Sequence, residues 1–241
     1  MKTAILSDVH ANLEALQAVL KVVDERGAGR ILCLGDVVGY GASPNECLDL
    51  IRERCKFVLL GNHDSASSGG PEAARFNPNA KAAALWTAKV LTHQNRDYLR
   101  GLPLSQRAEP YFYVHASPAA PRDWEYIFDR FDAEPQFQFF KEHACFIGHT
   151  HQPAIFERTS TGCEHLAPAK LQFDPAHRYI VNVGSVGQPR DRDPRACFLL
   201  LDEPAGTIDF ERVPYDIEAA QAKIRAANLP NVLATRLAVG E

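Results

Sequence analysis

Apolar and polar residues alternate in short blocks at the start of the chain. The apolar run at residues 3–6 predicts a strand, and a polar stretch follows it. The next apolar residues recur at helical spacing, at Leu13, Leu16, Leu20 and Val23. Asn12 fits the N-cap of this helix and Gly27 fits its C-terminal stop. The first segment therefore predicts a strand, a polar loop and a helix.

The same pattern repeats over the next thirty residues. Strands are predicted at residues 30–34 and 56–60. Between them, the sequence Ser43-Pro44-Asn45-Glu46 has the form of a capping box with proline at the first helical position, so a helix is expected from there to about Arg54. Each of the three strands ends in polar residues. Open α/β sheets bind their ligands at such carboxyl ends of strands.

The pattern in the rest of the chain is less regular. Residues 65–79 are rich in Ser, Gly, Pro and Asn and predict a long loop, and residues 80–99 predict helix with a break near Thr92. Residues 117–129 are expected to form a proline-bearing aromatic loop, and 217–227 a terminal helix. Six further strands are predicted, at residues 111–114, 144–147, 154–157, 179–183, 196–202 and 207–212.

Length and composition favour one folded domain. The chain has 241 residues, of which 46% are hydrophobic and 23% charged, a composition typical of globular proteins. A chain of this length buries enough surface to fold without a disulfide or a structural metal. Neither an internal repeat nor a long linker divides it, so residues 1–241 are interpreted as a single α/β domain with a second, partly antiparallel sheet.

Charge and cysteine content bear on the partners and the cellular compartment of the protein. The net charge of -4 provides no basic surface for long nucleic acids, although a single nucleotide or a small phosphoester remains compatible with it. The six cysteines form no C-x-x-C pair, which predicts reduced thiols. The N-terminus has no signal-peptide core, and no apolar run is long enough to span a membrane. We therefore expect a cytoplasmic protein without a membrane partner.

Oxygen and nitrogen donors follow five of the predicted strands. Asp8 and His10 share one face of an extended segment because they are two residues apart, and so do His149 and His151. Asp36, Asn62 and His115 also follow apolar runs. Alone, each of these residues is explained better as a helix cap, a turn residue or a buried histidine than as a metal ligand. Together they form a donor set without thiolate, which suits Mn, Fe, Co, Ni or Zn.

The five blocks D-x-H, G-D, G-N-H-D, H and G-H-x-H resemble the signature of the calcineurin-like metallophosphoesterase superfamily, and within it a group of small bacterial and archaeal phosphodiesterases. The resemblance implies a four-layer α/β/β/α sandwich with two mixed β-sheets and a metal site at the strand C-termini. It also implies two divalent ions, with manganese as the first expectation and Fe, Zn, Ni or Co as alternatives. One ion would be held by Asp8, His10 and His151, the other by Asn62, His115 and His149, with Asp36 bridging both.

Two neighbouring residues receive catalytic roles from the same resemblance. His63 is not a ligand and would protonate the leaving alkoxide or bind a phosphate oxygen. Asp64 would orient His63, or else cap a helix.

Substrate-binding candidates lie in the loops around these blocks. They are Asn62, Tyr40, Arg122, Tyr126 and Arg190, whose side chains could stack on a base or bind phosphate. The alternative is structural, since Tyr40 could fill the edge of the core and Arg190 could form a surface ion pair with Asp191.

The activity implied by the resemblance is hydrolysis of phosphodiester, and also phosphomonoester, bonds of small or nucleotide substrates by a metal-bridging hydroxide. Two alternatives stay open. The first is a non-catalytic metal-binding scaffold with the same fold, and the second is a diadenosine polyphosphate hydrolase or a protein phosphatase. The oligomeric state is not predicted by the sequence.

Overall fold

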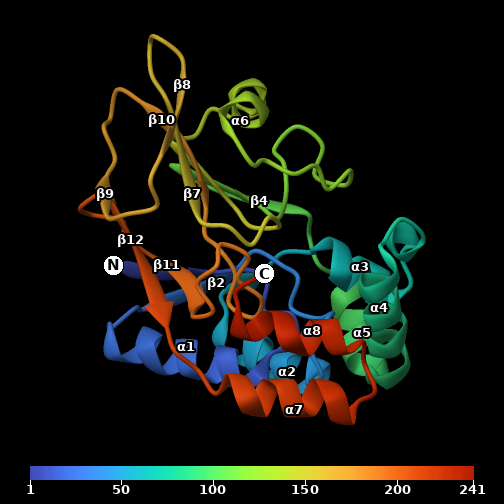
Figure 1. Cartoon of the computed structure of the whole chain (residues 1–241). Helices are drawn as coiled ribbons and strands as arrows, with labels where there is room; N and C mark the ends of the chain where they lie inside the picture. The colour runs from blue at the N-terminus through green and yellow to red at the C-terminus, as the bar shows by residue number, and fades with distance from the viewer.

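The computed structural model describes residues 1–241 (Figure 1). Its helices are α1 (Leu13–Glu25), α2 (Pro44–Arg54), α3 (Asn62–Ser68), η1 (Pro71–Ala74), α4 (Pro78–Val90), α5 (His93–Arg100), α6 (Arg130–Gln136), α7 (Ile217–Ala226), α8 (Asn231–Thr235) and η2 (Arg236–Ala238). The longest of them, α1 and α4, have 13 residues each. None of the helices combines the length and the apolar character that a bilayer crossing requires.

Twelve strands form two mixed sheets. They are β1 (Lys2–Leu6), β2 (Arg30–Cys33), β3 (Phe57–Val58), β4 (Ser105–Ala108), β5 (Tyr111–Val114), β6 (Ala144–Ile147), β7 (Ala154–Arg158), β8 (Cys163–Leu166), β9 (Leu171–Gln172), β10 (Arg178–Asn182), β11 (Ala196–Asp202) and β12 (Thr207–Val213). The first sheet has the order β3-β2-β1-β11-β12-β9, and the second the order β4-β5-β6-β10-β7-β8.

Parallel strands form the part of each sheet that supports the candidate site. In the first sheet, β1, β2 and β3 are parallel, whereas β11, β12 and β9 pair antiparallel. In the second sheet, β5, β6 and β10 are parallel, and the outer strands pair antiparallel. The carboxyl ends of β1 and β2, and those of β5 and β6, therefore lie at a common edge of their sheets.

The two sheets pack face to face, with helices on their outer faces (Figure 1). Side chains on β1 alternate, so that Leu6 packs against helices α1 and α2 while Ile5 joins the core between the sheets. The second sheet turns Phe156 outward against α6 and the residues that follow it. This arrangement confirms the expected four-layer α/β/β/α sandwich with two mixed sheets.

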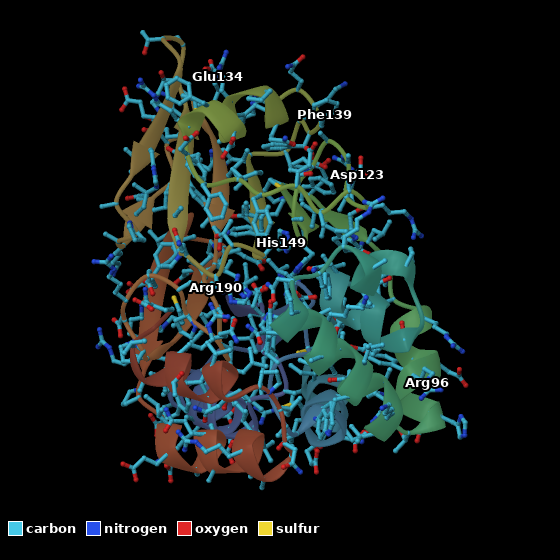
Figure 2. All side chains as sticks on the ribbon, turned by 45° about the vertical axis from the view of Figure 1, so that its right-hand side comes forward. Arg96, Asp123, Glu134, Phe139, His149 and Arg190 are labelled. Atoms are coloured by element: carbon cyan, nitrogen blue, oxygen red, sulfur yellow. The ribbon has the colours of Figure 1, made fainter.

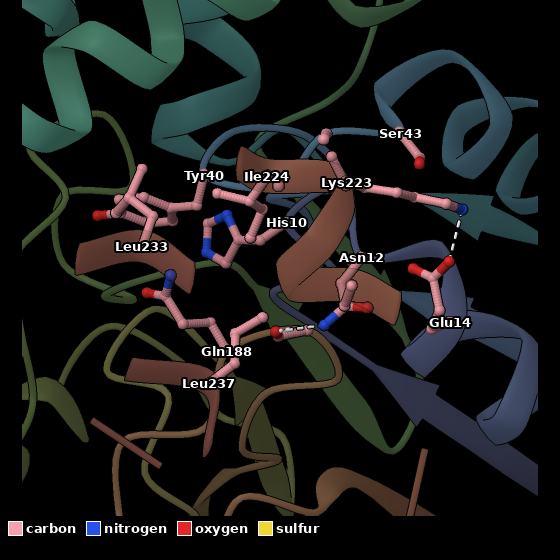
Figure 3. Close-up of a pocket in the computed structure, with 15 residues that line it drawn as sticks. His10, Asn12, Glu14, Tyr40, Ser43, Gln188, Lys223, Ile224, Leu233 and Leu237 are labelled. Atoms are coloured by element: carbon pink, nitrogen blue, oxygen red, sulfur yellow. Dashed lines mark hydrogen bonds and ion pairs between the residues drawn. The ribbon is translucent and has the colours of Figure 1, made fainter. Parts of the chain in front are cut away.

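The C-terminal helices complete one side of the molecule. Helices α7 and α8 share a buried cluster with α4 and with Tyr40, which lies in the loop after β2. Glu14 of α1 and Lys223 of α7 form an ion pair of 2.5 Å beside this cluster (Figure 3). The C-terminal segment thus supports the loop from which Tyr40 and Asp36 extend.

Several local predictions need correction. Residues 65–79 are not a continuous loop, because α3 and η1 form within them and the residues of α3 are buried against the rest of the fold. Ser43 makes no side-chain capping bond to α2, although Pro44 does occupy the first turn. The strand expected at 56–60 pairs only at Phe57 and Val58. The break near Thr92 is confirmed, since the Thr92 side chain caps α5.

Candidate metal centre

All seven predicted donors meet at the carboxyl ends of the parallel strands. Asp8 and Asp36 follow β1 and β2, and Asn62 begins α3 just after β3. His115 follows β5, and His149 follows β6 from the second sheet, with His151 two residues later. All seven are at least nine-tenths buried. Figure 2 shows His149 and Arg190 near the middle of the molecule, where the two sheets meet the helical side.

Six of these side chains form two compact groups. In the first, the Nε2 atoms of His10 and His151 are 3.0 Å apart, and His151 Nε2 lies 3.3 Å from Asp8 Oδ1. In the second group, His115 Nε2 lies 3.4 Å from Asp36 Oδ2, and His149 completes the set. Within each group, one donor atom of every residue lies within 4.8 Å of the others.

Asp36 faces both groups. Its Oδ2 atom is 3.4 Å from His115 Nε2 and 3.7 Å from His10 Nε2. Its other oxygen accepts a hydrogen bond of 2.8 Å from the backbone N–H of His63, which fixes the carboxylate plane. A carboxylate in this position can serve two cations at once.

Backbone carbonyls determine which ring nitrogen of each histidine faces the centre. The Nδ1 atoms of His10, His115 and His151 lie 2.6–3.1 Å from the carbonyl oxygens of residues 38, 34 and 188. A carbonyl can only accept, so each Nδ1 carries a proton and each Nε2 faces the centre, where a neutral ring presents a lone pair. His149 is reversed, because its Nε2 donates to the Trp124 carbonyl and its Nδ1 is left free. Such outer hydrogen bonds orient metal-ligating imidazoles in proteins.

Unpartnered polar atoms test whether cations fit here. Asp8 Oδ1, Asn62 Oδ1 and His115 Nε2 are buried and have no hydrogen-bond partner. Buried polar atoms are almost always satisfied, so three such atoms in one place indicate a missing partner. The lone pairs of His10 and His151 also repel each other at 3.0 Å unless a cation or a proton lies between them. The donor set therefore fits two divalent metal ions.

Burial keeps most of the imidazoles neutral. It lowers the pKa of His10 and of His151 well below the usual value, and the pKa of His149 to about 3. Burial also acts to lower the pKa of His115, but the negative charge of Asp36 outweighs it and raises that pKa to about 9. The same pairing holds the pKa of Asp36 well below its usual range despite burial. Neutral imidazoles and ionised carboxylates are the forms that bind metal.

His63 lies beside the centre without joining either group. Its ring packs against Tyr40 at 4.3 Å and against Phe76 at 4.5 Å between centroids. Its Nδ1 atom has no hydrogen-bond partner, and burial lowers its pKa to about 4. His63 is therefore held by packing, and its ring makes no hydrogen bond within the protein.

Asp64 is used as a cap. Its two carboxylate oxygens accept hydrogen bonds from the backbone N–H groups of Val38, at 3.0 Å, and Gly61, at 3.2 Å. No hydrogen bond joins it to His63. Burial, with Asp36 nearby, raises the pKa of Asp64 to about 8. Of the two roles expected for Asp64, the geometry matches the helix cap.

A cleft of about 500 Å³ opens beside the second group. Of the predicted substrate-binding residues, Asn62, Arg122 and Tyr126 line it together with His149. The Tyr126 ring stacks on the His149 imidazole at 4.1 Å, with 19° between the planes.

Tyr40 and Arg190 lie outside this cleft. Tyr40 is buried and lines a cavity of about 10 Å³ behind His10 (Figure 3). The Arg190 guanidinium lies 5.6 Å from the centre of the Tyr40 ring and donates a hydrogen bond of 2.7 Å to Gln188 Oε1. Arg190 therefore does not pair with Asp191 as the structural alternative required, because the Asp191 carboxylate binds Arg212.

Sequence reasoning missed several contributors to the site. The imidazoles are oriented by backbone carbonyls. Every residue type has a backbone carbonyl, so nothing in the sequence could have indicated which ones take part. Glycine is more informative, because a Cβ on Gly148 would collide with Ser7 and the Asp8 carboxylate, and one on Gly61 would collide with Asp36. Both glycines directly precede a donor, which is a signal that can be read from the sequence.

Comparisons with known proteins agree with this geometry. The model of the calcineurin-like phosphoesterase superfamily domain matches residues 1–205. An uncharacterized protein of Methanocaldococcus jannaschii is 40% identical over 98% of this chain and 97% of its own length. A metallophosphoesterase structure from Sphaerobacter thermophilus is 39% identical, has a TM-score of 0.89 and matches 100% of this chain and 99% of that one.

A third similarity concerns the fold alone. A hypothetical protein of Pyrococcus horikoshii OT3 shares 22% identity, with a TM-score of 0.81 over 100% of this chain and 98% of that chain. The fold and five donor-bearing strand ends thus agree with a family match over most of the sequence. The chain belongs to the calcineurin-like phosphoesterase superfamily.

Proposed function

We propose that this protein is a hydrolase that uses two divalent metal ions, manganese first among them, to cleave phosphodiester bonds of small or nucleotide substrates, and phosphomonoester bonds as well. One observation carries the proposal. Asp36 Oδ2 lies 3.4 Å from a histidine of one donor group and 3.7 Å from a histidine of the other, so a single carboxylate joins two potential metal sites.

The donors divide between the two ions. Asp8, His10 and His151 would hold one ion, and Asn62, His115 and His149 the other, with Asp36 shared. When bound, such a pair of ions neutralises charge on a phosphoryl group and lowers the pKa of water toward neutrality.

The protein's own part in the reaction begins with positioning. The carbonyls that accept from His10, His115 and His151 hold these rings in one tautomer and orientation, so no rearrangement is needed when substrate binds. The Asp36 carboxylate is fixed in the same way by the backbone of His63. Burial of every donor excludes bulk water, which strengthens the electrostatic interactions of the site.

His63 and Asn62 are placed to contact the substrate. The neutral His63 ring would donate a hydrogen bond from one nitrogen to a phosphoryl oxygen, and the protonated ring would donate a proton to the leaving oxygen. Asn62 lines the cleft, so its amide N–H group could donate to a phosphoryl oxygen, and its unpartnered Oδ1 would be the atom that holds a cation. Arg122, at the same cleft, adds a positive charge for an anionic substrate.

The test is a reconstitution panel. Metal-free protein would be loaded in turn with Mn, Fe, Co, Ni or Zn and assayed on phosphodiesters and phosphomonoesters that include nucleotides. We expect turnover with at least one metal and none without metal. A protein that binds the ions but cleaves no ester in the panel would instead be a metal-binding scaffold.

A further inference from the structure

Phe76, Trp124 and Tyr126 line the cleft, and two of these rings contact histidines of the candidate site. Phe76, just after η1, packs on His63 with ring centroids 4.5 Å apart. Tyr126, on the loop between β5 and α6, stacks on His149 at 4.1 Å. The cleft therefore begins at the candidate metal centre and has aromatic rings from two distant segments of the chain.

The aromatic surface continues outward from Tyr126. Phe128 stacks on Tyr126 with centroids 5.2 Å apart and 10° between the planes. Tyr126 is 47% exposed and Phe128 is 50% exposed. Two adjacent exposed aromatic rings leave apolar surface in contact with water, which is unfavourable. Such exposed apolar surface often marks a ligand-binding groove.

Three of the four charged residues that line the cleft are available to a ligand. Arg75 and Arg122 line it and neither side chain makes a hydrogen bond or an ion pair within the protein. Glu72 is already engaged, because Ser65 donates to one of its oxygens and the Trp124 indole N–H to the other. Asp123, also in the lining, has a carboxylate that makes no side-chain hydrogen bond. The cleft thus offers two free cations and one free acceptor.

The size of the cleft is appropriate for a nucleotide. Its volume of about 500 Å³ falls within the range of roughly 300–1,000 Å³ that is usual for small-molecule sites. Asn62 and His149, two of the predicted metal donors, are among its lining residues, so the cleft adjoins the place where the phosphoryl group would be.

We propose that this cleft is a nucleoside subsite, in which the base of a nucleotide substrate packs against Phe76 and the exposed part of Tyr126 while its phosphoryl group faces Asn62 and His149. This inference rests on the proposed function, since it names the substrate class of the same centre. Aromatic rings bind any nucleobase through its π-face, so the subsite discriminates nucleotides from simple sugar phosphates more than one base from another. Arg75 and Arg122 attract the anionic part of the ligand.

A binding experiment tests the subsite independently of turnover. The probes are the 5′-methylenephosphonate analogues of AMP and of ribose 5-phosphate, in which carbon replaces the scissile ester oxygen. Each is titrated calorimetrically into manganese-loaded protein, and metal content is measured for every variant. We expect the AMP analogue to bind roughly 5- to 150-fold more tightly than the analogue without a base, which is the range for stacking of one base.

Variants then locate the binding surface. Tyr126→Ala and Phe76→Ala should each reduce the ratio of the two affinities, whereas Tyr126→Phe, which keeps the ring, should preserve it. Phe131→Ala is the matched control, because Phe131 is 70% exposed and does not line the cleft. Tyr126→Ala could lose metal, because Tyr126 contacts His149. In that case the affinity ratio of Phe76→Ala tests the subsite, since Phe76 packs on His63, which lies outside both donor groups.

Two results would overturn the subsite. One is equal affinity of the wild-type protein for both probes, and the other is an affinity ratio that neither alanine variant changes. Failure of the proposed function would give a different result. A protein that hydrolyses no ester could still bind the AMP analogue more tightly than the analogue without a base. Conversely, a hydrolase that binds both probes equally would retain the function and lose the subsite.

Discussion

Five of the donor residues have a left-handed backbone. They are Asp8, His10, Asp36, His149 and His151, with φ between 49° and 67°. Residues other than glycine rarely adopt this conformation, which costs on the order of 1–3 kcal/mol at each position. The turns direct five side chains toward one point, and the surrounding core must supply the stability that they cost. Strain concentrated in this way is typical of functional sites.

Replacing the shared carboxylate tests the link between the two groups. Asp36→Asn should reduce metal-dependent hydrolysis at least about 100-fold, because an amide cannot provide the anionic oxygen that faces both sites. One of the two ions should be lost as well. Metal analysis of the purified variant and its rate with manganese are the measurements.

Asp24→Asn is the control for this variant, since Asp24 is an exposed residue that pairs with Arg54 on the helical side. It should retain both ions and the wild-type rate. Full metal occupancy together with wild-type turnover in Asp36→Asn would show that Asp36 does not bridge.

Removal of His63 separates catalysis from metal binding. His63→Ala should keep both ions, because its ring joins neither donor group. If His63 protonates the leaving oxygen, the rate should fall about 10²–10⁴-fold for alkyl or ribose leaving groups and much less for nitrophenolate, which leaves without a proton. Steady-state rates on the two ester classes measure this. Equal losses would assign His63 to phosphate binding, and loss of metal would contradict the assigned donors.

The sequence indicated the seven side chains that meet at the candidate centre but little of what positions them. Asp8, Asp36 and His115 could be found because each follows an apolar strand. The carbonyls of Leu34 and Gln188 could not, since any residue type supplies a carbonyl. The left-handed backbone at these aspartates and histidines could not be predicted either, because only a few per cent of residues other than glycine adopt it and nothing in the sequence marks which ones do.

At the scale of elements, Asn12 links helix α1 to a loop from the far end of the chain. Its Oδ1 caps α1 by accepting from Ala15 N–H, and its amide donates to the Gly187 carbonyl at 2.9 Å (Figure 3). Asn12→Ala should reduce the free energy of unfolding by about 2–4 kcal/mol, since it removes a cap and leaves a buried carbonyl unsatisfied. Urea unfolding followed by circular dichroism measures the change.

A second asparagine cap provides the comparison. Asn77 caps α4 through Asn79 and Ala80 N–H groups, but its bonds lie at the surface. Asn77→Ala should therefore cost only about 1 kcal/mol. Equal losses in the two variants would mean that the contact between Asn12 and Gly187 adds nothing to stability.

Helices and strands could be predicted where the element's own sequence has a clear hydrophobic pattern. The strands at β1, β2 and β11 and the helix α1 have clear periodicity and were expected. Helix α3 was not, because its sequence of Ser, Asn and Asp disfavours helix and forms one only through burial of the whole segment. Strand β8, with its Cys-Glu-His-Leu sequence, depends on pairing with β7 rather than on its own propensity.

Over the whole molecule, the core does not depend on metal. The cluster between the sheets and the cluster under α1 and α2 are apolar and continuous without any donor residue. Metal-free protein should therefore keep its far-ultraviolet circular dichroism spectrum while losing all hydrolysis. Its melting temperature should be lower by roughly 10–20 °C than at a metal concentration 100 times the Kd of both sites, from the stabilisation that binding of two ions provides. An unfolded spectrum after metal removal would show that the ions are structural.

The central claim, that two ions share one carboxylate and together hydrolyse phosphoesters, is tested most directly by titrating metal-free protein with manganese. Bound metal per chain and the rate on a phosphodiester would be followed in the same samples. The account predicts that binding saturates at two ions per chain and that activity rises with occupancy of the second ion. Saturation at one ion, or two bound ions with no hydrolysis of any phosphoester, would contradict it.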